Sequence, residues 1–205
     1  MRVLPMFPLG NVLLPGGVLS LHVFEPRYQS LVRDCIAADD HEFGVVLIDR
    51  GHEVGGGDVR RPVGTVARMV QVAELPDGRF AVIAVGVQRL RVERWLADDP
   101  YPIAEIEEWD DLDEPVDAGR LSEITQRARR AAALALELGD AATDPSVDVS
   151  DEPRAASYQL AELAPVGAAD AYDLLCSAGP GARLGLLDAL LGDLEAVQAF
   201  RLQSP

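Results

Sequence analysis

The sequence contains no lysine, and this removes several kinds of chemistry at once. All 18 basic residues are arginines. A Walker A loop needs a lysine to reach the β- and γ-phosphates of a nucleotide, and the glycines at 55–57 are followed by Asp58, Arg60 and Arg61 instead. Ser-Lys dyads and Schiff-base enzymes need a lysine amine as well. These mechanisms are therefore excluded, although a genome biased towards arginine and alanine codons explains the absence most simply.

Histidine and cysteine are too few and too widely spaced to predict a metal site. The histidines are His22, His41 and His52, and the cysteines are Cys35 and Cys176. No two histidines stand four residues apart, and no cysteine pair has the short spacing of a zinc motif. We therefore predict no metal and no cofactor. His22 is expected in the core or at the edge of a strand, and the other two histidines are expected to be solvated.

No nucleophile lies in a recognisable catalytic motif. There is no GxSxG sequence, and Cys35 falls on the apolar stripe of an expected helix, where a buried thiol is inert. The carboxylates between Glu105 and Asp111 form a run that is typical of a solvated edge. We therefore predict no catalytic residues and no enzyme activity. A hydrolase that uses Cys35, or a serine with a histidine from a distant segment, stays open as an alternative.

The elements that would position a site divide into a β-rich part and a helical part. Apolar runs bounded by turns predict strands at 18–23, 43–48, 65–72, 80–85, 88–95 and 101–109. A hairpin turn is expected at 75–78, because Pro76 fixes φ and Gly78 supplies a positive φ. Pro5, Pro8 and Pro15 allow only edge or irregular strand geometry. One helix is expected from 26 to about 39.

After residue 117 the apolar residues recur at helical spacing. Helices are expected at 118–138, from Pro153 through 163, at 169–176 and at 182–200, with Gly192 as a candidate break. Residues 139–152 hold five acidic residues and no basic one, which predicts a solvated acidic loop. The expected fold is α+β, with a β-rich lobe at 1–115 and a helical lobe at 116–205.

The charge balance bears on partners and location. Thirty-four acidic residues against 18 basic ones give a formal net charge of −16. Such a chain repels phosphate backbones and anionic lipid, so nucleic acid and membranes are not expected partners. No apolar run reaches the length of a membrane span, and prolines interrupt the N-terminal segment where a signal peptide would be apolar. We expect a cytoplasmic protein.

The first 70 residues carry a set of motifs in an uncommon order. They are LPMFPLGNVLLPGG at 4–17, LSLHVFEPRY at 19–28, FGVVL at 43–47 and VGTVAR at 63–68. In this order they resemble the substrate-binding N-terminal domain of Lon proteases, and most closely the stand-alone bacterial proteins that consist of that domain only. The leucine-rich segments around 173–175, 183–184 and 190–191 resemble the C-terminal helices of that family. The resemblance therefore covers nearly the whole chain.

The resemblance implies a PUA-like twisted sheet or pseudo-barrel lobe, followed by a helical bundle. It also implies binding of unfolded proteins, partner proteins or peptides, without the ATPase and protease parts for which the chain has no room and no lysine. The candidate binding residues are Phe24, Glu25, Arg27 and Tyr28, beside a groove between the sheet and the first helix. The same residues also fit a simple helix start with an Arg–Glu pair and a packing tyrosine.

RNA binding stays open as a further alternative, because PUA-like folds include RNA binders. Six arginines of the β-rich part would then have to form a local basic face despite the negative net charge: Arg60, Arg61, Arg68, Arg89, Arg91 and Arg94.

Overall fold

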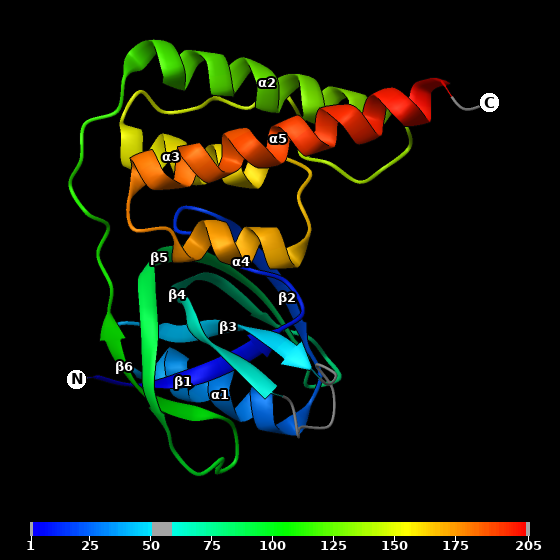
Figure 1. The fold of residues 1–205 in the computed structure, drawn as a ribbon. Helices are drawn as coiled ribbons and strands as arrows, with labels where there is room; N and C mark the ends of the chain where they lie inside the picture. Colours follow the sequence, from blue (N-terminus) through cyan, green and yellow to red (C-terminus); the bar gives the residue numbers. More distant parts are fainter. Residues whose placement is uncertain (1, 51–58, 204–205) are drawn as a thin grey trace. The chain divides into compact units, whose positions relative to one another are not determined.

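The computed structural model describes residues 2–50 and 59–203, and the chain forms two compact units, Met1–Asp110 and Asp111–Pro205 (Figure 1). The first unit contains a six-stranded sheet and helix α1, and the second contains helices α2 to α5. The predicted α+β class is therefore confirmed. His52 and the glycines at 55–57 lie outside the described residues.

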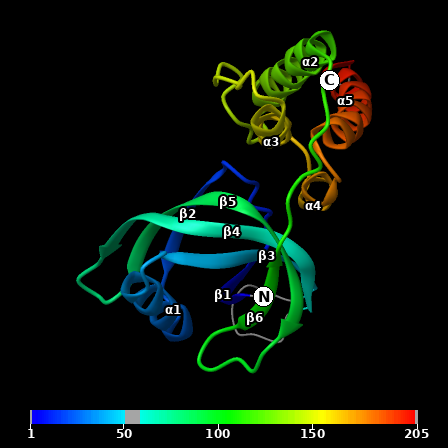
Figure 2. The same cartoon turned by 90° about the vertical axis from the view of Figure 1, so that its left-hand side faces the viewer.

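The sheet of the first unit closes on itself. Its strands are β1 (Arg2–Leu9), β2 (Val18–Val23), β3 (Glu42–Arg50), β4 (Val59–Glu74), β5 (Phe80–Trp95) and β6 (Ile103–Glu108). They follow the order β2-β5-β4-β3-β1-β6, and β6 pairs with β5 as well. Five strands therefore form a ring, and β2 extends the sheet beyond it. The strong curvature of β4 and β5 is visible from the side (Figure 2).

Strand β5 is one continuous strand, where the sequence predicted two. Its first half pairs with β2 and its second half with β6, while β4 runs beside both halves. The interruption in the apolar pattern is a β-bulge at Val87, because Val66 lies opposite Gln88 and Ala67 opposite Gly86. A bulge bends a strand without ending it. The prediction of separate strands was therefore wrong.

Strand β1 tolerates two prolines because each of its halves pairs with a different strand. Arg2 to Pro5 pair with β6, and Met6 to Leu9 pair with β3 in parallel. Each proline therefore lies beside a paired strand on one side only, as at a sheet edge, although β1 stands between β3 and β6 in the strand order. Proline is confined to such positions because it has no N–H to donate to a neighbouring strand.

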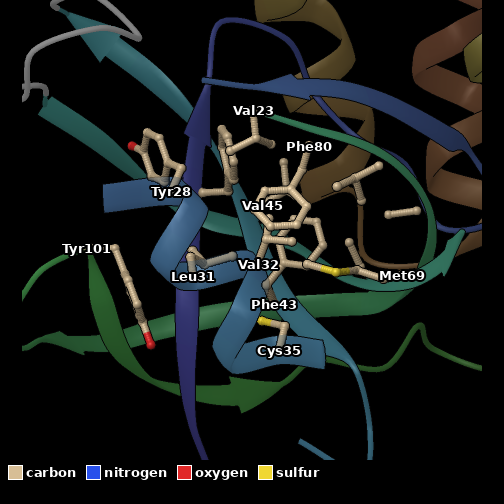
Figure 3. Close-up of a cluster of buried hydrophobic side chains, with 14 of the residues drawn as sticks. Val23, Tyr28, Leu31, Val32, Cys35, Phe43, Val45, Met69, Phe80 and Tyr101 are labelled. Carbon is tan, nitrogen blue, oxygen red and sulfur yellow. The ribbon is translucent and has the colours of Figure 1, made fainter. Parts of the chain in front are cut away.

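Alternate residues of the strands enter two separate cores. One core lies inside the ring and consists of Leu4, Met6, Val46, Val66, Leu90, Ala104 and Ile106. The other includes Phe7, Val45 and Phe80 from the opposite strand faces, and α1 (Pro26–Ala37) covers it with Leu31 and Val32 (Figure 3). Because residues 42–47 of β3 are all buried, this strand reads as an apolar run and not as an alternating one.

The second unit is a helical bundle. Its helices are α2 (Ala118–Glu137), α3 (Pro153–Leu163), α4 (Ala168–Cys176) and α5 (Pro180–Gln203). The candidate break at Gly192 does not occur, since α5 continues through it. Arg183 is fully buried and donates to both carboxylate oxygens of Asp111, to the Ser157 hydroxyl and to the Tyr158 hydroxyl. These bonds tie α5 to α3 and to the segment before α2.

Candidate functional site

A groove of about 170 Å³ in the first unit contains most of the residues that the sequence singled out. We call it the β2 groove. It is lined by residues of β1, of β2 and of the start of α1: Phe7, Leu9, Ser20, Leu21, His22, Val23, Phe24, Glu25 and Tyr28. Its floor is apolar, because Phe7, Leu9, Val23 and Tyr28 belong to the core beneath α1. Val23 and Tyr28 enter that core from β2 and α1 respectively (Figure 3).

The first turn of α1 holds the side of the groove rigidly. Pro26 occupies the first helical turn, where its missing N–H costs nothing. The Arg27 side chain donates to the Glu25 carboxylate (Nε–Oε2 3.1 Å), and its guanidinium lies 4.5 Å from the centre of the Tyr28 ring. Tyr28 in turn stacks on Phe7 with a centroid distance of 4.1 Å. Each of these side chains is therefore held by a neighbour.

Phe24 is the exception in this rigid segment. Its side chain is 55% exposed at the rim of the groove, whereas Tyr28 is only 3% exposed. The Phe24 carbonyl accepts from Gln29 (3.2 Å), so the backbone that carries the exposed ring is anchored to α1. An exposed aromatic ring on an anchored backbone loses little conformational entropy when a partner covers it. Phe24 is therefore the side chain best placed to contact a partner.

The structure brings three of the four candidate residues into one groove. Phe24, Glu25 and Tyr28 line it, and the Arg27 guanidinium packs on the ring of Tyr28. The sequence did not identify the residues of β1 and β2 that complete the groove, because only the strand arrangement brings them beside α1. The binding role of the four residues stays a prediction.

A second hollow, of about 410 Å³, lies beside the end of α1 and the second half of β4. It is lined by Ile36, His41, Met69, Val70, Gln71, Val72, Glu74 and Phe80. His41 has φ of 55°, and its Nδ1 lies 3.0 Å from the Cys35 carbonyl oxygen. The imidazole therefore contacts the backbone of Cys35, while the thiol points to the Glu42 carbonyl at 3.5 Å.

The Cys35 thiol has the environment of a core residue. Its residue is 2% exposed, and burial, with the nearby carboxylates of Asp40 and Asp34, raises the pKa of the thiol to about 12. At neutral pH the thiol is protonated and therefore a poor nucleophile. This environment disfavours the hydrolase alternative that uses Cys35. Among the described residues, no cluster of histidine, cysteine and acidic side chains has the arrangement of a metal site.

The arginines proposed for a basic face are largely engaged with carboxylates. Four of them form ion pairs: Arg60 with Asp98, Arg61 with Asp49, Arg68 with Glu42, and Arg94 with Glu105. Arg89 is 1% exposed and donates to the Asp110 carbonyl, and Arg91 lies 4.5 Å from the centre of the Trp109 ring. Paired arginines attract phosphate weakly. The arrangement therefore disfavours RNA binding.

Comparison with known proteins identifies relatives of this fold and sequence. The family described as the ATP-dependent protease La (LON) substrate-binding domain matches residues 3–192. Lon protease 2 of Myxococcus xanthus is 34% identical over 149 residues, which is 70% of this chain and 18% of that protein. The Lon protease of Anaeromyxobacter dehalogenans is also 34% identical, over 69% of this chain and 17% of its own length. The chain thus spans less than a fifth of these relatives.

Solved structures agree with this assignment. The Lon N-terminal domain protein from Xanthomonas campestris is 30% identical, with a TM-score of 0.70, and the match covers 92% of this chain and 98% of that one. The N-terminal domain of the Mycobacterium avium complex Lon protease has a TM-score of 0.67 at 18% identity, which supports the fold alone. Among the residues placed in the structure, no helix is both long and apolar enough to cross a membrane.

Proposed function

The chain belongs to the LON substrate-binding domain family, and from this membership we propose that it is a non-catalytic module that binds unfolded proteins or peptides. The β2 groove supports the proposal most directly. It joins an apolar floor to an exposed aromatic rim, the combination that apolar side chains of an unfolded segment can cover. A folded protein buries such side chains and offers the groove much less.

The proposal assigns no proteolytic step to these residues. The absence of lysine removes the Walker A chemistry of an ATPase and the Ser-Lys chemistry of a protease from this sequence. Burial keeps the Cys35 thiol protonated, and a protonated thiol is a poor nucleophile. Binding without chemistry is therefore the function that these residues support best. The cytoplasmic location expected from the sequence stays a prediction.

A binding titration tests this function. Fluorescein-labelled lysozyme that has been reduced and alkylated with iodoacetamide stays unfolded, and the same basic protein with intact disulfides is folded. We expect fluorescence anisotropy to rise with added protein for the unfolded form and to stay near its starting value for the folded form. Equal affinity for the two forms, or no binding of either, would contradict the proposal.

A further inference from the structure

Strand β2 has one open edge. It is the last strand in the order of the sheet, and β5 is its single partner among the described strands. The Gly86 amide donates to the Gly17 carbonyl (2.9 Å) in continuation of the β2–β5 register. Opposite residues of an antiparallel pair alternate between bonded and non-bonded, so the odd-numbered residues of β2 bond to β5. The even-numbered residues direct their N–H and C=O groups to the open side: Val18, Ser20 and His22.

The β2 groove runs along this open edge. Four consecutive residues of β2, from Ser20 to Val23, line the groove. Its other lining residues belong to β1 and to the start of α1, and none belongs to β5, the pairing partner of β2. The groove therefore lies on the side of β2 away from β5. An occupant would meet unpaired backbone groups on one side and the apolar ring of Tyr28 below.

Strand β2 lacks the features that usually protect an open edge. Proteins blunt such edges with charged side chains, prolines or bulges. The second half of β4 is also unpaired on one side, since β3 accompanies β4 only as far as Arg68, but it carries a bulge at Val70. Strand β2 pairs with β5 in an unbroken register and contains no proline, arginine or acidic residue. Of these two edges, β2 is the better template for another strand.

Charge complementarity sets the second property of the occupant. The chain carries a formal net charge of −16, and Glu25 lines the groove with its carboxylate paired to Arg27, so the net charge is the main source of the field. This field repels an acidic segment and attracts a basic one. The volume of about 170 Å³ is well below the roughly 300–1,000 Å³ of pockets that enclose a small-molecule ligand. It therefore suits one or two side chains of a longer chain.

We propose that the open edge of β2 binds an extended, basic segment of an unfolded protein as an added β-strand, with an apolar side chain of that segment in the β2 groove. Backbone hydrogen bonds then supply affinity for any extended sequence, and the groove selects an apolar residue. This inference rests on the proposed binding of unfolded proteins, and it names the binding mode and the substrate class.

Two variants of one residue test the use of the edge. Ser20→Pro removes an outward N–H that no ladder bond to β5 uses, and its ring occupies the position of the added strand. Ser20→Ala is the matched control, because it changes the side chain and keeps the N–H. The probe is a short fluorescein-labelled peptide in which valine and leucine alternate with threonine between terminal lysines. We expect Ser20→Pro to bind the peptide at least about tenfold more weakly than Ser20→Ala, the variant that shares the loss of the hydroxyl.

Modified peptides test the same edge on the unaltered protein, and therefore do not depend on the folding of a variant. A strand bonds to one neighbour through alternate amides. N-methylation of one alternate set should abolish binding, and methylation of the other set should leave it nearly intact. Replacement of the lysines by glutamates should weaken binding, and the weakening should diminish in high salt.

The outcomes separate the binding mode from the function. Equal effects of the two methylation sets, or equal affinity of the Ser20→Pro and Ser20→Ala proteins, would overturn the added strand. An edge occupied by a second copy of the chain would overturn it as well. That outcome would be a dimer in analytical ultracentrifugation that Ser20→Pro dissociates and that the peptide does not. If unfolded lysozyme still binds in these cases, only the binding mode fails. If it does not bind to the unaltered protein, the proposed function fails as well.

Discussion

Replacement of Phe24 by alanine should weaken the binding of unfolded proteins with little effect on folding. Full burial of a phenylalanine side chain contributes about 1.5–3 kcal/mol. Since 55% of Phe24 remains exposed in the free protein, a partner that covers the ring can gain about half of that, roughly 0.8–1.6 kcal/mol. The corresponding loss on Phe24→Ala is roughly a 4- to 15-fold increase in Kd.

The assay is the anisotropy titration with reduced, iodoacetamide-alkylated lysozyme. Phe200→Ala is a matched control, because Phe200 is also a strongly exposed phenylalanine, at 71%, but belongs to α5 in the other unit. We expect Phe200→Ala to leave Kd unchanged within about twofold. Thermal unfolding of both variants verifies that they are folded, since surface substitutions usually change stability by about 0.5 kcal/mol or less.

The comparison of the two variants has a result that refutes the reasoning. If Phe24→Ala leaves Kd unchanged while Phe200→Ala raises it, the partner contacts α5 and the β2 groove is not the binding site. If both variants raise Kd equally, binding depends on exposed apolar area in general, and the rim of the groove has no special role.

Three further predictions concern buried groups. Arg183→Met should lower the stability of the second unit by about 3–5 kcal/mol, because it leaves the Asp111 side chain, which is 2% exposed, without its main partner. Circular dichroism at 222 nm should report the change, and the tryptophan emission of the first unit serves as an internal reference. At pH 8 the folded protein should offer Cys176, which is partly exposed, to Ellman's reagent, and Cys35 only after denaturation. Burial raises the pKa of the Cys35 thiol from 9.0 to about 12, so the unfolded state loses this proton at lower pH than the folded state. The urea midpoint of the first unit should therefore fall as pH rises from 9 towards 12, and it should fall less steeply in Cys35→Ala.

The elements that the sequence identified well are those whose signals are local. The helix starts at Pro26 because of the proline itself, and β2 starts directly after the Gly16–Gly17 turn. Both observed starts coincide with the predicted ones. The 75–78 turn is likewise local, since Gly78 has φ of 80° and its amide bonds to the Leu75 carbonyl. Such features depend on a few adjacent residues and require no knowledge of the tertiary structure.

The elements that the sequence missed depend on distant partners. Nothing near Gly86 in the sequence indicates that β5 continues. The strand is continuous because β4 pairs with both of its halves, on either side of the bulge at Val87. Gly86 itself is required by a distant contact, since a Cβ there would lie 2.3 Å from the Leu14 carbonyl oxygen. The apparent strand break was therefore a close approach between the backbone and the loop before β2.

The groove shows the same division at the level of single residues. Phe24, Glu25 and Tyr28 lie together in the sequence, so a motif could point to all three. Phe7 reaches them only because β1 runs parallel to β3 and passes beneath the start of α1, where its ring stacks on Tyr28. The open edge of β2 is still less visible in the sequence, because an edge is defined by the strand that is missing beside it. A binding surface built from an edge strand and a helix start therefore requires the strand order before any of its residues can be given a role.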